Sequence, residues 1–444
     1  MKIGIIILKF VILLLKGYFM KKLNYSILTA ILLGILFNIN LFAQKDVPPA
    51  TQDFGIKFSG FVKTDFAFDT RQSATIREDH FLLYPKKELL DANGDDINGV
   101  PSLNILSIQT RLTGKITAPD FLGAKTSGII EGAFFGSAEG NINTFRLRHA
   151  FLKLEWENTH LMVGQFWHPM FIEDNFPGVV SFNTGVPFQP FSRNPQIRLT
   201  QKLGFMDIIL AACSQRDFQS FAPIMDAGKE ISGNTSEASR DAVVPDLNAT
   251  FKFKAGTHLF GFGGEYKMLK PRTSFLGVKT DNMVNSYAAM AFAKLVFGDF
   301  SVKLEGIYGQ NLANMTMLSG YWVKAVDSVA KTEEYTPSNL LSAWGELSYG
   351  KDVEISIFGG YTKNMGAAED IISGGTFFGR GSDIESVLRV APRVIWTVGK
   401  VKFACEIEYT QAAYGAIDKT DKMKVIDTKS VSNIRALLAG YLFF

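Results

Sequence analysis

Cysteine and histidine are scarce in this chain of 444 residues, with only two of the former and five of the latter. Cys213 and Cys405 lie far apart in the sequence and provide no disulfide framework. No G-x-S-x-G motif occurs, and no two histidines have the H-x-x-x-H spacing of a metal-binding helix. The sequence gives no indication of an enzyme, and we expect no catalytic residue, no metal and no cofactor.

Three histidines, His149, His160 and His168, stand near acidic residues in the sequence, such as Glu155 and Glu173. None of them has a ligand spacing or a recognisable nucleophile beside it. We expect these rings to line a turn, a subunit interface or an aromatic girdle.

Long apolar runs occur only near the start of the chain, at 3–15 and 27–36. The second run follows the basic pair at 21–22 and precedes the small residue Ala43, which is typical of a secretory signal peptide. We predict a signal peptide over 1–43, with Met20 as the alternative start of translation. A membrane anchor made of both runs is the other interpretation.

Beyond the leader, no run of about 18 apolar residues occurs, so we expect no transmembrane helix. Only helices and closed barrels satisfy all backbone hydrogen bonds in lipid, which leaves a closed β-barrel as the membrane-spanning option. Charged residues make up 20% of the chain, the formal net charge is +3, and basic residues do not cluster. Nucleic-acid binding is therefore not expected.

Apolar and polar residues alternate with a period of two from residue 54 onward, which is the pattern of half-buried strands. In 401–409 the side chains of Val401 and Phe403 share an apolar face, while Glu406 and Glu408 share the other. An apolar face suits lipid, and a charged face suits water inside a barrel.

Sixteen segments show this alternation, and they are separated in turn by short and long connections. The segments are 54–68, 102–117, 123–136, 142–157, 159–167, 193–204, 205–216, 246–255, 257–269, 284–297, 299–311, 338–349, 351–364, 383–398, 400–414 and 430–444. Tight turns are expected at 119–120, 157–158, 204–205, 255–256, 298–299, 350–351 and 399–400, which carry Gly, Asn, Asp or Pro. Long connections are expected at 69–101, 168–192, 217–245, 312–337, 365–382 and 415–429.

The fold class predicted from this rhythm is all-β, a transmembrane antiparallel barrel of about sixteen strands. Short turns face the periplasm and long loops face the outside. The barrel occupies 54–444, and a short extension, 44–53, precedes it.

The connection 168–192 is longer than a compact domain normally contains. We expect it to fold into the barrel and narrow the lumen, with Phe182, Phe188 and Phe191 packing against the wall. Glu173 and Asp174 would then face arginine-bearing strands.

Two segments depart from simple alternation. In 142–157 the phase changes near Ala150, because Leu152 and Leu154 would otherwise face the lumen. A β-bulge is one explanation, and burial against a neighbouring subunit is the other. Pro392 predicts a bulge or an interrupted ladder within 383–398.

Basic side chains are frequent on the faces predicted to line the lumen. They are Lys63, Arg111, Lys115, Arg146, Arg148, Arg198, Arg389, Arg393 and Arg435. Guanidinium groups match carboxylate and phosphate geometry, which favours a pathway for anions. The alternative is that these residues pair with acidic residues of the wall and only stabilise it.

The segment 91–96 carries three aspartates and an asparagine, Asp91, Asn93, Asp95 and Asp96, and these are side chains of the kind that bind hard cations. It lacks the glycine and terminal glutamate spacing of a calcium hand. We interpret it as a solvated loop that binds no metal.

Several short pieces resemble the DcaP-like, dicarboxylate-type trimeric porins, which are related in architecture to the phosphate-selective porins. These pieces are residues 59–63 (SGFVK), 146–151 (RLRHAF), 164–167 (GQFW), 193–198 (RNPQIR) and 305–311 (EGIYGQN). The resemblance implies a sixteen-stranded trimer for small anions such as dicarboxylates or phosphate, with constriction arginines at Arg146, Arg148, Arg193 and Arg198. It covers most of the chain, but the short extension predicts no N-terminal coiled coil.

Taken together, the sequence predicts an outer-membrane porin of a Gram-negative bacterium for passive diffusion of small anions. The alternatives are an adhesive or binding barrel without an open channel and, with least support, an outer-membrane hydrolase. The expected partners are outer-membrane lipid, two further copies of the chain and the barrel-assembly machinery, which would recognise the last strand ending at Phe444. A trimer interface is expected on the first five strands.

Overall fold

The computed structural model describes residues 53–77, 79–136 and 139–444. The predicted signal peptide, 1–43, and nearly all of the predicted extension lie outside the described residues. Among the described residues, no helix has the length and hydropathy needed to cross a membrane.

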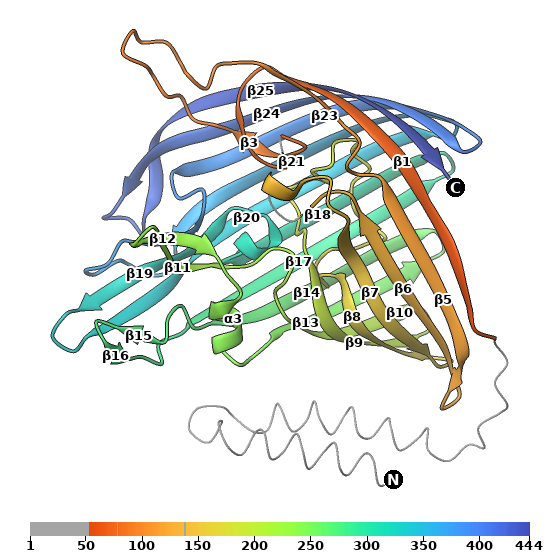
Figure 1. Ribbon diagram of the computed structural model, residues 1–444, viewed down its shortest axis with the longest axis horizontal. Helices are drawn as coiled ribbons and strands as arrows, with labels where there is room; N and C mark the ends of the chain where they lie inside the picture. Colours follow the sequence, from red (N-terminus) through yellow and green to blue (C-terminus); the bar gives the residue numbers. More distant parts are fainter. Residues whose placement is uncertain (1–52, 78, 137–138) are drawn as a thin grey trace.

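The described chain forms one closed antiparallel β-barrel of sixteen strands (Figure 1). The strands in order are β1 (Gly55–Asp69), β4 with β5 (Ser102–Leu106 and Arg111–Phe121), β6 (Ala124–Ala133), β7 (Arg146–Glu155), β8 (Thr159–Trp167), β9 (Arg193–Leu203), β10 (Met206–Cys213), β13 (Asp246–Ala255), β14 (His258–Leu269), β17 (Val284–Phe297), β18 (Phe300–Gln310), β20 (Thr332–Gly350), β21 (Val353–Ala367), β23 (Ile384–Val398), β24 (Val401–Asp418) and β25 (Lys424–Phe443). All neighbouring strands pair antiparallel, and β25 pairs with β1 from Phe61↔Phe443 to Asp69↔Arg435, which closes the barrel.

Shorter elements lie in the connections between barrel strands. They are β2 (Ser73–Ile76), β3 (Phe81–Pro85), η1 (Glu139–Asn141), β11 (Phe221–Asp226), β12 (Lys229–Asn234), α3 (Glu237–Asp241), β15 (Ser274–Phe275), β16 (Val278–Lys279), η2 (Ala313–Met315), β19 (Ser319–Asp327) and β22 (Phe377–Arg380). The hairpin that β19 forms with β20 lengthens the barrel wall beyond the predicted start at 338.

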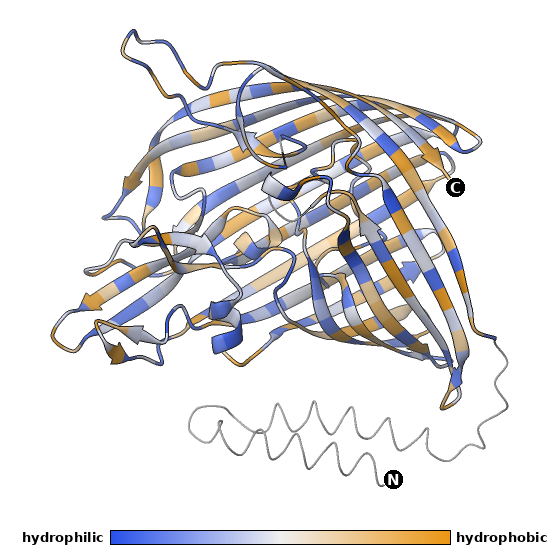
Figure 2. Ribbon diagram, viewed as in Figure 1, coloured by the Kyte–Doolittle hydropathy of each residue, from blue (hydrophilic) through white to orange (hydrophobic). Residues whose placement is uncertain are grey.

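Alternation of side chains explains why these segments form barrel strands. On β24, Phe403 and Ile407 are exposed on the outer face, whereas Glu406 and Glu408 are buried. Figure 2 shows the same exchange of hydrophobic and hydrophilic residues along most strands. The burial of acidic groups on one face and exposure of apolar groups on the other is the arrangement expected for a barrel surrounded by lipid.

Both ends of the barrel chain lie at the end that carries the short turns (Figure 1). The N–H of Phe443 donates to the carbonyl oxygen of Lys400, which belongs to the turn between β23 and β24, at 2.8 Å. One turn differs from its prediction: the strands β5 and β6 meet at Leu122 and Gly123, not at 119–120. Both turn residues have positive φ, which a two-residue hairpin turn requires.

The long connection expected at 415–429 is also shorter in the structure. Strand β24 continues to Asp418 and β25 begins at Lys424, and the two pair up to that point. The alternation of apolar residues becomes weak beyond residue 414, so the sequence pattern ended the strands too early.

The irregularity predicted in 142–157 is a β-bulge. Glu131 is opposite His149, whereas Gly132 is opposite Leu147, so Arg148 is the extra residue on β7. The bulge lies one to two residues before the expected position near Ala150, and Arg148 and His149 are both buried. At Pro392 no residue is inserted, because the pairs Val390↔Tyr409 and Arg393↔Glu406 share one register, and only the ladder pairs between them are missing.

The segment predicted as one strand over 102–117 is interrupted. Asp65 of β1 is opposite Leu106, and Phe61 is opposite Arg111, so four steps along β1 match five on its partner. The Thr110 N–H donates to the carbonyl oxygen of Ser107 at 3.2 Å and closes a local turn. This break places Gln109 at the cavity described below.

Candidate functional site

The connection between β8 and β9, residues 168–192, is attached to distant strands of the barrel. The backbone N–H groups of Val180 and Ser181 donate to the Glu406 carboxylate on β24 at 2.8 and 2.9 Å. The N–H of Gly178 donates to the Glu346 carboxylate on β20 at 2.6 Å. Since β8 and β9 are many strands away from β20 and β24 in the barrel order, this connection crosses between two sides of the barrel.

The three phenylalanines singled out in this connection are all buried. The ring of Phe188 lies 6.0 Å from that of Phe358 on β21, and the ring of Phe191 lies 5.1 Å from that of Trp167. Phe182 packs 4.0 Å from Phe135, centroid to centroid. These rings join the connection to several parts of the wall.

Two other connections meet the same cluster, which the sequence did not indicate. Phe81 of β3 lies 5.5 Å from Phe182. The carbonyl oxygen of Met315, in η2, accepts a hydrogen bond from the N–H of Phe191 at 2.9 Å. Arg389 of β23 donates to the carbonyl oxygen of Val186 at 2.6 Å.

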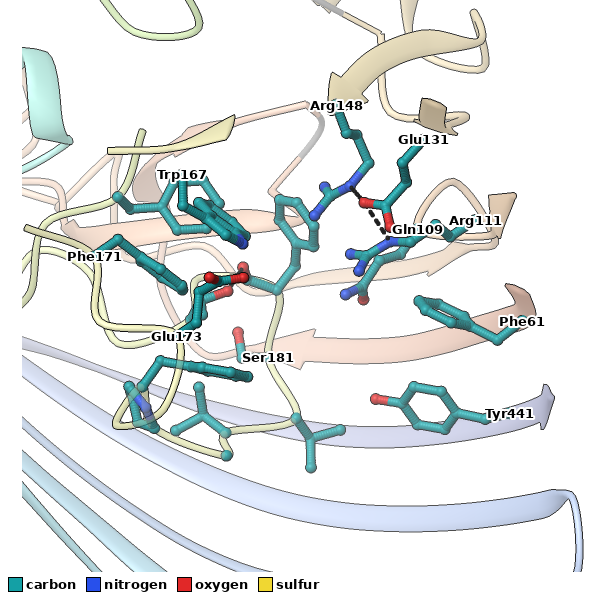
Figure 3. A pocket seen from close by; sticks show the side chains of 18 of the residues that line it. Phe61, Gln109, Arg111, Glu131, Arg148, Trp167, Phe171, Glu173, Ser181 and Tyr441 are labelled. Carbon is teal, nitrogen blue, oxygen red and sulfur yellow. Dashed lines mark hydrogen bonds and ion pairs between the residues drawn. The ribbon is translucent and has the colours of Figure 1, made fainter. Parts of the chain in front are cut away.

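A cavity of about 610 Å³ lies between the 168–192 connection and the wall formed by β1, β5 to β8, β24 and β25. Figure 3 shows Arg111, Arg148 and Gln109 together on one side of this cavity, with Trp167 and Glu173 on the other. Its size lies within the range of about 300–1,000 Å³ that small-molecule sites occupy. We take this cavity as the candidate functional site.

One carboxylate serves two guanidinium groups on the cavity wall. Arg148 Nε lies 2.8 Å from Glu131 Oε1, and Arg111 Nε lies 3.7 Å from the same oxygen. Arg148 Nη1 is buried and has no hydrogen-bond partner among the residues that the structure describes. The pair of arginines therefore keeps donor capacity and an excess of one positive charge.

Next to this group, two further arginines share one aspartate. Arg146 Nη1 lies 3.1 Å from Asp217 Oδ1, and Arg193 Nη2 lies 2.8 Å from Asp217 Oδ2. Burial alone would raise the pKa of Asp217, but the guanidinium groups of Arg193 and Arg146 outweigh it and hold the pKa below its ordinary value. Asp217 stays charged, and this group again has an excess of one positive charge.

Arg198 differs from the other predicted arginines. Its Nη2 donates to the carbonyl oxygen of Trp167 at 2.6 Å, and its Nε donates to Gln196 Oε1 at 2.9 Å. No carboxylate lies within 4.0 Å of it in the described part of the chain. Its guanidinium group stands 5.2 Å over the ring of Phe166, which lines the cavity.

Four of the remaining predicted basic residues form ion pairs on the wall, whereas the fifth, Lys115, is exposed on β5. These pairs are Lys63 with Asp65 at 2.9 Å, Arg389 with Glu408 at 3.2 Å, Arg393 with Glu346 at 3.0 Å, and Arg435 with Asp69 at 2.7 Å. Their contacts fit the alternative interpretation, in which basic and acidic residues stabilise the wall. An anion-binding role for these four stays a prediction.

The two acidic residues predicted at the constriction have different surroundings. Asp174 Oδ2 accepts a hydrogen bond from Lys252 Nζ on β13 at 3.0 Å. Glu173 lines the cavity, and no ion pair joins it to another described residue within 4.0 Å. Glu173 is therefore the acidic group that faces the arginines.

Several residues of the site were not selected from the sequence. Glu131 lies on the wet face of 123–136, and Lys402 on the wet face of 400–414, so alternation alone would have found both. Gln109 enters the cavity only because the strand breaks at 107–110. Asp217 lies in a connection, where no periodicity indicates a direction.

His168 begins the turn 168–171, in which the N–H of Phe171 donates to its carbonyl oxygen at 2.8 Å. It is fully buried, and its Nε2 lies 3.4 Å from Glu265 Oε2, with Asp246 also within 4.8 Å. Its Nδ1 accepts a hydrogen bond from the N–H of Met170 at 3.3 Å. A donor at Nδ1 favours the neutral tautomer with its proton on Nε2, the nitrogen that faces the Glu265 carboxylate.

The aspartate-rich loop at 91–96 is organised by its own hydrogen bonds. Asp91 Oδ1 accepts from the N–H groups of Asn93 and Asp95 at 2.8 and 2.9 Å. These two bonds lower the pKa of Asp91. Asp96 Oδ2 pairs with Arg71 Nη1 at 2.6 Å. The carboxylates of Asp91 and Asp96 are thus occupied by contacts with other groups of the protein.

No known family model and no curated protein sequence matches this chain. Solved structures do match it. The outer membrane channel DcaP of Acinetobacter baumannii is 16% identical with a TM-score of 0.64, over 90% of this chain and 100% of that chain. An anion-selective porin from Comamonas acidovorans is 10% identical with a TM-score of 0.51, over 88% of this chain and 100% of that chain.

The trimer form of OmpT, an outer membrane protein of Vibrio cholerae, is 11% identical with a TM-score of 0.51, over 88% of this chain and 100% of that chain. At these identities the likeness establishes the fold. The chain therefore has the fold of outer-membrane porins, and the resemblance to the DcaP-like group seen in the sequence extends to the three-dimensional structure.

Proposed function

We propose that this protein is an outer-membrane porin through which small solutes diffuse passively, with a preference for anions. The observation that carries the proposal is the unequal sharing of charge in two groups, one on the cavity wall and one beside it. Arg148 and Arg111 share Glu131, and Arg146 and Arg193 share Asp217. Four guanidinium groups thus share two carboxylates.

A charge excess of this kind acts strongly within a barrel. Low-dielectric walls focus the field of the arginines, so the local concentration of anions rises above that of cations. Arginine forks also match the geometry of carboxylate and phosphate groups. The porin from Comamonas acidovorans, which shares the fold, is described as anion-selective.

The 168–192 connection forms the constriction in this proposal. Its attachment to Glu346 and Glu406 brings Glu173 to the side of the cavity that faces Arg111 and Arg148. Acidic and basic groups on opposite sides of a narrow aqueous gap produce a transverse field, and solute anions pass along the basic wall. No covalent chemistry is needed for this function, and the protein is not an enzyme.

We also propose that the protein is a homotrimer in the outer membrane of a Gram-negative bacterium, inserted by the barrel-assembly machinery through the strand that ends at Phe444. An apolar groove on the outer face of β1, β5 and β6 supports the position of the interface. It is lined by Ile56, Phe58, Leu112, Ile116, Ile130 and Phe145, which come from the first strands of the barrel.

An occluded barrel that binds or adheres without conducting is the second candidate. The observation in its favour is the buried hydrophobic cluster in which residues of three connections, such as Phe81, Phe188 and Met315, pack with Phe358 of the wall. A cluster of this size is capable of closing a barrel.

Conductance of the purified mature protein in a planar bilayer separates these candidates. We expect stepwise openings, and a reversal potential in a KCl gradient that has the sign of chloride selectivity. Absence of conductance would favour the occluded barrel. A cation-selective reversal potential would contradict the proposed anion preference while leaving a porin function intact.

A further inference from the structure

The candidate cavity combines a small number of charged groups with an unusual amount of aromatic surface. Eight phenylalanine, tyrosine and tryptophan rings line it from three sides: Phe61 and Tyr441 from β1 and β25, Phe166 and Trp167 from β8, and Phe171, Phe176, Phe182 and Phe191 from the 168–192 connection. A solute that carries only charge would leave these rings in contact with water. Apolar surface exposed in this way usually marks a place where an apolar group binds.

Five of these rings keep accessible surface, so a solute can reach them. Phe176 is 40% exposed, and Phe61, Phe166, Trp167 and Tyr441 are half-buried. Trp167 and Phe171 are stacked at 3.9 Å with an angle of 14° between their planes. Phe176 stacks on Phe171 in turn, at 5.6 Å with an angle of 25°, and the guanidinium group of Arg193 stands 4.9 Å over Trp167. The exposed ring of Phe176 therefore ends a flat stack onto which a further planar group can pack, because aromatic rings favour offset-stacked and edge-to-face neighbours.

The charged groups provide one anchor for an anion. Arg148 and Arg111 lie beside each other on β7 and β5, and Arg148 Nη1 lacks a hydrogen-bond partner among the described residues. Figure 3 shows this anchor on one side of the cavity, with Trp167 and Phe171 across from it. A carboxylate held by the arginines would therefore direct the body of its molecule toward the rings.

We propose that the cavity favours carboxylates that carry a flat aromatic ring over aliphatic carboxylates of the same charge. This inference rests on the proposed function, since the solute must enter the barrel. It goes further by naming the chemical class that the cavity retains longest. Inorganic phosphate or sulfate would use the arginines alone and gain nothing from the rings.

Two carboxylates of equal charge and similar size test this preference: benzoate, with a planar aromatic ring, and cyclohexanecarboxylate, with a puckered saturated ring. The experiment measures the concentration of each that halves the KCl current of the mature protein in a planar bilayer at neutral pH, where both are ionised. Stacking on an aromatic ring favours binding by about two- to tenfold. We expect benzoate to block at a concentration lower by that factor.

Variants locate the preference. Phe176→Leu is expected to abolish the difference between the two carboxylates, and Trp167→Leu to reduce it. Trp396→Leu changes an aromatic residue that is 55% exposed on the outer face of β23, and it should leave the difference unchanged. Phe176 is the more exposed of the two cavity rings. Phe176→Leu therefore tests the preference even if the Trp167→Leu protein fails to insert into the bilayer. Arg111→Gln should weaken block by both carboxylates equally.

The possible failures are distinguishable. A conducting, anion-selective channel blocked equally by benzoate and cyclohexanecarboxylate would overturn the aromatic preference and leave the proposed function standing. A preference retained in both Trp167→Leu and Phe176→Leu would place aromatic binding elsewhere and overturn this site. A barrel without conductance would overturn the proposed function, and the aromatic preference with it.

Discussion

Arg148 Nε donates to Glu131 Oε1 at 2.8 Å across the neighbouring strands β7 and β6. The bulge at Arg148 makes this contact, because the extra residue turns Arg148 and His149 to the same side of the sheet. Without the bulge, strict alternation would turn either Arg148 or the residues that follow it to the opposite face of the sheet. The strongest charge contact of the cavity thus depends on a local irregularity of one strand.

Neutralising Glu131 and neutralising Arg111 should change ion selectivity in opposite directions. Glu131→Gln leaves two guanidinium groups without their carboxylate, so the anion-to-cation permeability ratio should rise. Arg111→Gln should lower it. A unit charge 4 Å from a permeating ion contributes about 1 kcal/mol in a water-like medium, so each change should be about fivefold at low salt. The reversal potential under a KCl gradient measures both, and shifts of the same sign would contradict the prediction.

The two acidic residues of the constriction should contribute unequally. Glu173 lines the cavity, whereas Asp174 is paired with Lys252 at 3.0 Å. Glu173→Gln should raise the anion-to-cation permeability ratio, and Asp174→Asn should change it by less than half as much. The two variants are matched controls for each other. An equal effect of both on the reversal potential would mean that the pair with Lys252 opens in the membrane.

Removal of the Glu406 side chain should release the 168–192 connection. Glu406→Ala leaves the N–H groups of Val180 and Ser181 without their acceptor, and each unsatisfied buried group costs about 1–3 kcal/mol. We expect larger current fluctuations and a lower unfolding temperature in detergent. Cys405→Ala changes the neighbouring residue on the outer face and should alter neither. Currents of Glu406→Ala that fluctuate no more than those of the unaltered protein would show that the other contacts of the 168–192 connection are enough to hold it in place.

A charge in the apolar groove of β1, β5 and β6 should prevent trimer formation. Phe58 is 63% exposed in the isolated chain and lines this groove. Phe58→Lys should yield monomers by native mass measurement in mild detergent. Phe262→Lys places the same charge on β14, at a ring that is 51% exposed, and should remain trimeric. Monomers from both variants, or from the unaltered protein, would remove the proposed interface.

The sequence alone determined the barrel. Side-chain direction along a strand alternates at every residue. A strand with one face in lipid and the other in the barrel interior therefore has apolar and polar residues in alternation, which can be seen in the sequence. For this reason the expected strands 159–167, 246–255 and 284–297 agree with the structure at both ends. An irregularity in β7 was also visible, since its apolar residues change face within one segment, but the sequence left open whether a bulge or burial against a neighbouring subunit explains it.

Only the tertiary structure decided which groups meet at the cavity. Val180 and Glu406 are 226 residues apart, and their contact depends on the path of an irregular connection that carries no periodic pattern. The sharing of Glu131 by Arg111 and Arg148 depends on the register of three strands and on two local irregularities, the break before β5 and the bulge in β7. Alternation gives the face on which a side chain stands, but register and loop path decide its partner, because both are fixed by contacts between residues far apart in the sequence.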